Sequence, residues 1–118
     1  MRTRIINLTA HTVVVLSGPR ELARFSPSGS VARVNEITAM GLPLKTDVGE
    51  VPLTAVRYSC EVSDLPEPQA GVLYLVSRVL AAAIDRDDLV FPCDEVRDSE
   101  GRIVGCRSLG TFAGAARA

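Results

Sequence analysis

His11 is the only histidine of the chain, and Thr9 and Asn7 precede it at alternate positions. Alternate residues of an extended backbone share a face, so these three polar side chains are spaced to line a ligand pocket. A turn in which Asn7 and Thr9 hydrogen-bond to their own backbone would use the same residues structurally. The spacing alone leaves both interpretations open.

Arginine supplies almost all of the positive charge, because twelve arginines accompany the single Lys45. A guanidinium is a rigid, planar fork of donors that matches carboxylates and phosphates. A GC-rich genome would also raise the arginine count, without functional meaning. Arginines in strand-like segments need solvent or an acceptor, and a tyrosine ring can stack on the flat part of a ligand. We expect the ligand-binding set to comprise Asn7, Thr9, His11, Arg33, Arg57, Tyr58, Tyr74 and Arg102.

Three cysteines offer a different chemistry. Cys93, His11 and Asp94 are the residue types of a nucleophile, a base and an orienting acid. Zinc would need Cys60, Cys93, Cys106 and His11 from four separate segments, with no C-x-x-C pair to start the site. We therefore expect reduced, dispensable thiols, no zinc and no catalytic residue.

Acidic residues gather at 85–88, which reads Asp-Arg-Asp-Asp after a predicted helix. Carboxylates there could bind Mg²⁺ and support hydrolysis of a phosphate ester. Acids beside a helix C-terminus are unfavourable without a cation, and Arg86 can supply that cation internally. Before the helix, Ser77 could cap it or, with Arg78, receive a phosphate. We expect ordinary capping, no metal and no cofactor.

Short β-branched runs separated by turn residues make up the first half of the chain. Glycines and prolines at 40–52 predict a long loop with at most a short edge strand. An opening hairpin or meander is predicted from residues 5–8 and 13–16, and a second hairpin is predicted from residues 22–25 and 31–37.

The second half contains one helical pattern, in which apolar residues recur at helical spacing after Ser77. Gly101 is suited to the left-handed position of a tight hairpin turn. The expected elements are an extended segment at 54–60, a connector at 64–70, a buried strand at 71–76, a short strand at 89–91 stopped by Pro92, and a hairpin at 96–104. The fold class is therefore α+β, with a mostly antiparallel β sheet or partly open barrel and one short helix at about 77–86.

Length and composition indicate one domain over 1–118, with 110–118 as a flexible tail. The net charge of −1 supplies no field for DNA or RNA. Residues 1–6 show no secretion signal, and the apolar stretch 71–84 is shorter than the roughly 20 residues that span a bilayer. We expect a soluble, cytoplasmic protein without membrane contact.

Several motifs follow one another in a distinctive order. They are NLTAH at 7–11, PSG at 27–29, ARV at 32–34, LPEP at 65–68, GVLYLVS at 71–77, RDDL at 86–89 and the segment 96–109. Along almost the whole chain, this order resembles a small family common in phages, prophages and mobile elements. That family usually has Pro where this chain has Ala10, a change that loosens the turn and leaves His11 in place. The resemblance implies a phage or mobile-element context and transfers neither an activity nor a site residue.

The leading functional hypothesis is non-catalytic binding of a small anionic ligand, phosphate-bearing or nucleotide-like. Sequestration of a signalling nucleotide is its concrete version, with a pocket that a homo-oligomer could complete. One alternative is a structural or protein-interaction module, and another is a small metal-dependent hydrolase. An exposed apolar patch without a cleft would favour the interaction module.

Overall fold

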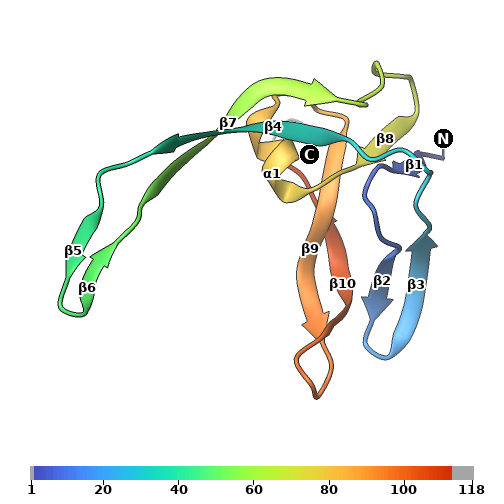
Figure 1. Cartoon of the computed structure of the whole chain (residues 1–118). Helices are drawn as coiled ribbons and strands as arrows, with labels where there is room; N and C mark the ends of the chain where they lie inside the picture. The colour runs from blue at the N-terminus through green and yellow to red at the C-terminus, as the bar shows by residue number, and fades with distance from the viewer. Residues whose placement is uncertain (1, 113–118) are drawn as a thin grey trace.

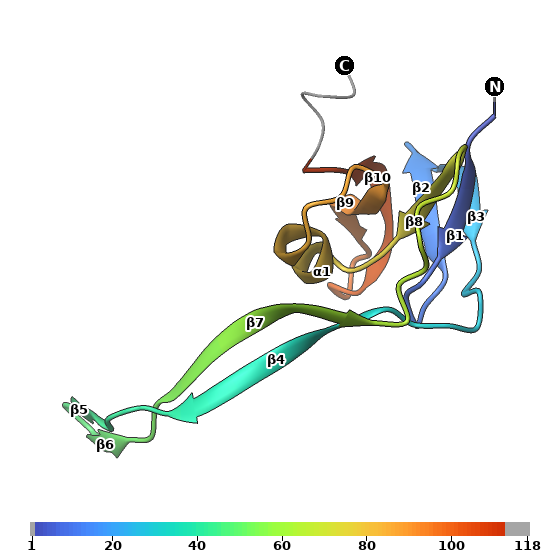
Figure 2. The same cartoon turned by 90° about the horizontal axis from the view of Figure 1, so that it is seen from above.

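The computed structural model describes residues 2–112 of the chain, so the predicted tail lies mostly outside the described residues. The chain divides into a body and a long arm (Figures 1 and 2). The body comprises residues 2–32 and 64–112, and the arm comprises residues 33–63. The mostly β fold with one short helix is confirmed.

The body is built on a six-stranded mixed sheet with the order β1-β8-β9-β10-β2-β3. The β9–β10 and β2–β3 pairs are antiparallel, whereas β1–β8, β8–β9 and β10–β2 are parallel. A parallel pair needs a crossover connection, and the helix α1 provides it between β8 and β9. The strands are β1 (Arg4–Asn7), β2 (Val13–Ser17), β3 (Arg20–Phe25), β8 (Val72–Leu75), β9 (Leu89–Arg97) and β10 (Ile103–Gly110).

Both hairpins predicted in the first half are wrong. β1 pairs with β8, about 65 residues later in the chain, and β2 turns back through Gly18 to pair with β3. β3 therefore already has its antiparallel partner, and β4 (Arg33–Met40) pairs with β7 (Thr54–Ser63) instead. Turn residues mark where the chain reverses, but the choice of neighbour depends on which faces become buried.

The predicted helix is present as α1 (Arg78–Ala83) and is shorter than expected. The side chain of Ser77 accepts a hydrogen bond from the Leu80 N–H at 3.2 Å, so capping at Ser77 is confirmed. Beyond α1, β9 continues through Pro92, where a stop was predicted. Its pairing with β8 ends at Val90, and proline is tolerated where one side of a strand is unpaired.

The hairpin predicted at 96–104 is confirmed as the turn between β9 and β10. Gly101 has a φ of +80°, the left-handed region that glycine adopts without strain. The Asp98 N–H donates to the Arg102 carbonyl at 2.9 Å, and the Asp98 carboxylate accepts from the backbone N–H groups of Glu100 and Arg102.

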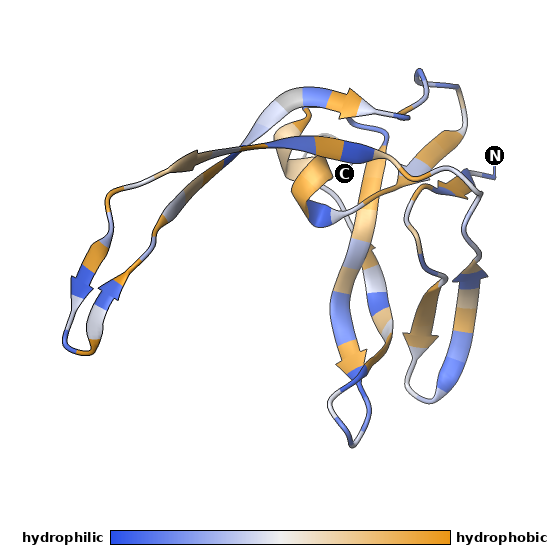
Figure 3. Ribbon diagram, in the orientation of Figure 1, coloured by the Kyte–Doolittle hydropathy of each residue, from blue (hydrophilic) through white to orange (hydrophobic). Residues whose placement is uncertain are grey.

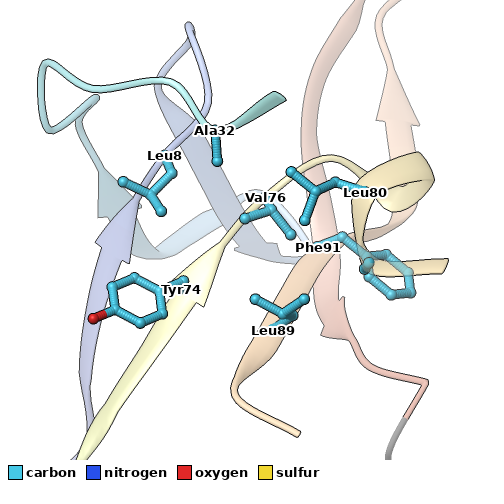
Figure 4. Packing of buried hydrophobic residues seen from close by; sticks show 8 residues of the cluster. Leu8, Ala32, Tyr74, Val76, Leu80, Leu89 and Phe91 are labelled. Atoms are coloured by element: carbon cyan, nitrogen blue, oxygen red, sulfur yellow. The ribbon is translucent and has the colours of Figure 1, made fainter. Parts of the chain in front are cut away.

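Two hydrophobic clusters form the core of the body. The first lies between the sheet and α1, where side chains from β8, β9, α1 and the β3–β4 connection face one another (Figure 4). Tyr74, Val76 and Leu80 have no exposed surface at all. The second cluster comprises Val13, Leu75, Val90 and Cys106. Burial on both sides explains why the 71–76 run is almost continuously apolar.

The sheet curls because its two edge strands approach each other at one end. The Asn7 side-chain amide of β1 donates to the Phe25 carbonyl of β3 at 2.8 Å. The connection after β3 then crosses β1, with the Ser28 N–H bonded to the Asn7 carbonyl and the Ala32 N–H bonded to the Leu8 carbonyl. These contacts produce the partly open barrel that the sequence indicated.

The arm leaves the body beside α1 and extends away from it (Figure 2). Its outer end is a second hairpin, β5 (Leu44–Thr46) with β6 (Gly49–Val51), in place of the predicted loop at 40–52. The Cα radius of gyration is 17.6 Å, whereas a compact domain of this length has about 13–14 Å. The arm accounts for the difference.

Candidate functional site

The polar side chains at 7–11 build a turn. Asn7 is buried, and its amide nitrogen donates to the carbonyls of His11 and Phe25, both at 2.8 Å. Its amide oxygen accepts from the Thr9 N–H at 2.9 Å and the Thr9 hydroxyl at 2.7 Å. The local-turn interpretation therefore accounts for Asn7 and Thr9, while the His11 side chain is exposed.

Tyr74 was expected to stack on a ligand, and its position corrects that expectation. The residue has no exposed surface and lies in the first core cluster (Figure 4). Its hydroxyl donates to the Glu67 carbonyl and accepts from the Gln69 amide, both at 3.0 Å, and the Arg86 guanidinium lies 5.8 Å from the ring centroid. A ring enclosed in this way cannot reach a ligand.

The candidate arginines do not meet within one chain. Arg102 lies at the tip of the β9–β10 hairpin, where its guanidinium contacts the carboxylates of Asp98 and Glu100. Arg33 and Arg57 lie on the arm, with Arg33 at the first pair of the β4–β7 ladder, opposite Ser63, and Arg57 in its middle, opposite Ile37. Within one chain these arginines belong to separate hairpins, because a strand-like sequence does not determine which hairpin a residue joins.

Arg57 and Tyr58 are neighbours on β7 but occupy opposite faces of the arm, because Arg57 is opposite Ile37 and Tyr58 is opposite Glu36. Both side chains are exposed. Among residues 2–112, neither Arg33 nor Arg57 forms a salt bridge. These two guanidiniums are thus open to an anionic partner from outside the chain.

The acidic stretch at 85–88 contains a structural ion pair. Arg86 Nε and Nη2 donate to the two carboxylate oxygens of Asp88 at 2.9 and 2.5 Å. This pair raises the pKa of Arg86, chiefly through the hydrogen bond to Asp88. Arg86 thus supplies the internal cation, and Asp88 is buried. Within the described part of the chain, no group of three or more His, Cys, Asp or Glu side chains is arranged to hold a metal ion.

The two described thiols lie in different settings. Cys106 is 2% exposed in the second cluster, and burial raises its pKa. Cys93 is half-buried, and its sulfur lies 3.7 Å from Arg78 Nη2. The Arg78 guanidinium also lies over the Phe91 ring at 4.9 Å. These contacts hold Arg78 against the sheet beside α1.

Hydrophobic segments recur along the ribbon of the arm (Figure 3), and its large apolar residues between Ile37 and Tyr58 are exposed. Its most exposed residues are Met40, Leu42 and Val48, at 96%, 86% and 87%. Soluble monomers rarely leave a continuous apolar surface of this kind uncovered. Further exposed apolar residues of the arm are Ile37, Leu44, Val51, Leu53, Val56 and Tyr58.

A shallow groove of about 530 Å³ lies where the β4–β7 ladder meets the outer hairpin. We call this junction, residues 40–43 and 52–54, the elbow. The Gly41 N–H donates to the Leu53 carbonyl at 2.9 Å and closes the elbow across the two strands. The groove is lined by Thr38, Ala39, Met40, Gly41, Pro43, Glu50, Pro52, Leu53 and Thr54.

Sequence reasoning missed the elbow because it treated residues 40–52 as a loop. One signal was present, since Met40, Leu42, Leu44, Val48, Val51 and Leu53 are apolar residues among glycines and prolines. Loops that lie in solvent are usually polar, so apolar residues there indicate a contact surface.

Comparisons with known proteins found no matching family model, no matching curated protein and no matching solved structure. Over residues 2–112 there is no helix of the length and apolarity needed to cross a membrane. The exposed arm and its two arginines are the features that the body's own packing does not explain.

Proposed function

We propose that this protein acts without catalysis, as an interaction module whose working surface is the arm. The observation that carries the proposal is the near-complete exposure of Met40, Leu42 and Val48 on a ribbon of paired strands that projects from a packed body. Removal of a side chain of this size from water contributes about 1.5–3 kcal/mol, from which the cost of association is subtracted. A partner that covers the arm therefore gains several such contributions.

The construction of the arm supports the same proposal. A two-stranded ribbon is marginal in water when neither face is covered. Here both faces carry apolar residues, Ile37 and Ala39 on one and Val56 and Met40 on the other. Its outer edges also carry backbone groups that another chain can pair with. A solvated spacer would need none of these features.

The setting of the module is part of the proposal. The motif order implies a phage or mobile-element context, and a reducing cytoplasm suits the unpaired thiols of Cys93 and Cys106.

Site-specific photo-crosslinking in cells tests the arm as the contact surface. A photoreactive residue at position 42 should give discrete adducts. The same residue at position 22 or 103, where Leu22 and Ile103 are exposed on the body at 53% and 52%, should give few. Equal adduct patterns from arm and body positions, or no adducts from position 42, would refute the proposal.

Binding of a small anionic ligand is the second candidate, and the unpaired Arg33 and Arg57 favour it. Each charge-assisted contact contributes about 1.5–3 kcal/mol, so two contacts need further enclosure to give micromolar affinity. Tyr58, 49% exposed on the opposite face, could supply that enclosure only toward a second chain. This candidate therefore requires an assembled form of the protein.

Calorimetric titration with mono-, di- and cyclic nucleotides tests the second candidate. A hit should be weakened by Arg33→Ala or Arg57→Ala, whereas Arg102→Ala and His11→Ala serve as controls away from the arm. Absence of binding below about 1 mM, or binding that survives both arm substitutions, would exclude it.

A further inference from the structure

We infer that the partner of the arm is a second copy of this chain, and that two copies meet through their elbows. The inference rests on the proposed function, because it identifies the occupant of the same surface. Three features of the arm point to a second copy: its shape, its charge and its size.

The elbow carries both a hollow and projecting side chains. A two-fold interface uses the same patch on both copies, so that patch must be complementary to itself. The groove lies beside Leu42 and Met40, which project almost fully into solvent. Each copy can thus insert its projecting residues into the groove of the other. Met40 suits this role because a flexible thioether side chain fills irregular space.

The charges of the outer arm favour a near-neutral partner. Lys45 lies opposite Glu50 in the β5–β6 register, and Asp47 is the remaining charged residue of that hairpin. Two identical surfaces of this composition repel each other only weakly. A strongly basic or acidic partner, by contrast, would find no complementary field.

The seven residues of the elbow are fewer than a stable interface needs, so the contact must extend from the elbow along the exposed strands of the arm. Specific complexes bury about 800 Å² and about 20–30 residues on each side. Of the arm residues 33–63 whose burial is described, only Val34, Gly41, Ser59 and Val62 are partly covered. A second arm therefore offers a surface of the same extent and the same apolar character.

Two prolines limit how the copies can associate. Pro43 and Pro52 flank the groove and lack the N–H group that a continuous strand ladder requires. The β4–β7 ladder also changes register between Val34 and Glu36. Interruptions of this kind disfavour open-ended pairing of strand edges, and a two-fold contact between elbows closes with two copies.

Sedimentation velocity and light scattering on the purified full chain test the inference. Between about 1 and 100 µM the mass should rise toward twice 12.6 kDa. Leu42→Glu should weaken self-association at least tenfold, whereas the body variant Leu22→Glu should leave it unchanged. A monomer at every concentration, or equal behaviour of the two variants, would overturn the inference.

A charge-swap experiment separates loss of contact from loss of folding. Leu42→Glu and Leu53→Lys chains should each be weakened alone, because residue 42 of one copy enters the groove that Leu53 lines in the other, and an equimolar mixture should recover association as a mixed dimer. Failure of the mixture to recover would rule out elbow-to-elbow contact. If the chain stays monomeric but position 42 crosslinks in cells to a different protein, the second-copy inference fails and the proposed function stands. If neither occurs, both fail.

Discussion

The body and the arm contain the same kinds of apolar residue, but the body buries them and the arm exposes them. In the body, the apolar runs of β8 and of the first part of β9 are enclosed by the sheet and α1. In the arm, comparable valines and leucines of β4–β7 and the outer hairpin remain exposed. The body therefore buries its own hydrophobic surface, whereas the arm leaves its hydrophobic surface exposed. Strand content alone does not distinguish a core from an interface.

Truncation of one leucine in each region gives the largest contrast. Leu80→Ala should lower the free energy of unfolding by about 2–5 kcal/mol, because the side chain is fully buried and leaves a cavity. Leu42→Ala should change it by no more than about 0.5 kcal/mol in dilute solution. Urea denaturation measures both. Equal losses would mean that the arm belongs to the folding core.

Substitution of one asparagine in each region compares a buried polar side chain of the body with an exposed one of the arm. Asn7→Ala should cost about 1–3 kcal/mol, because the carbonyls of His11 and Phe25 lose their donor where β1 meets β3. Asn35→Ala on the exposed arm should cost about 0.5 kcal/mol or less. Thermal melting reports both values. An unchanged melting temperature of the Asn7→Ala variant would show that the turn does not stabilise the curled sheet.

Turn glycines distinguish the two hairpins. Gly101→Val should destabilise the body by about 1 kcal/mol or more, because a β-branched residue resists a φ of +80°. Gly49→Val at the arm tip, where φ is +128°, should strain only the outer hairpin and leave global unfolding nearly unchanged. Chemical denaturation followed by circular dichroism tests this. A similar global loss from Gly49→Val would contradict the independence of the arm.

A rise to alkaline pH should have the smallest effect on the free energy of unfolding, and this effect should come from the body alone. Burial raises the pKa of Cys106 in the folded state, so the unfolded chain loses the thiol proton first. The free energy of unfolding should therefore decrease as pH rises from about 8.5, the ordinary thiol value, toward the raised pKa. Cys106→Ala should flatten this dependence, and Cys93→Ala should retain it. An identical pH profile in the Cys106→Ala variant would exclude the buried thiol as the cause.

Local features of the molecule were readable from the residues themselves. The Ser77 cap, the Gly101 turn and the buried run of β8 were all predicted correctly, because each depends on neighbours a few residues apart. The partly open sheet with one short helix also followed from the pattern of short β-branched runs. Even the internal partner for the acids at 85–88 could be named in advance as Arg86.

Partners across long distances in the chain were decided only by the tertiary structure. β1 pairs with β8 and β4 with β7, so both predicted N-terminal hairpins were wrong. For the same reason the residues of the candidate site lie apart in the structure. Asn7 belongs to a turn, Tyr74 lies in the core, and Arg57 lies on the arm. A run of apolar residues prescribes burial but not its location. In this chain the body buries one set of such residues, whereas the arm leaves the other set, from Met40 to Val56, exposed.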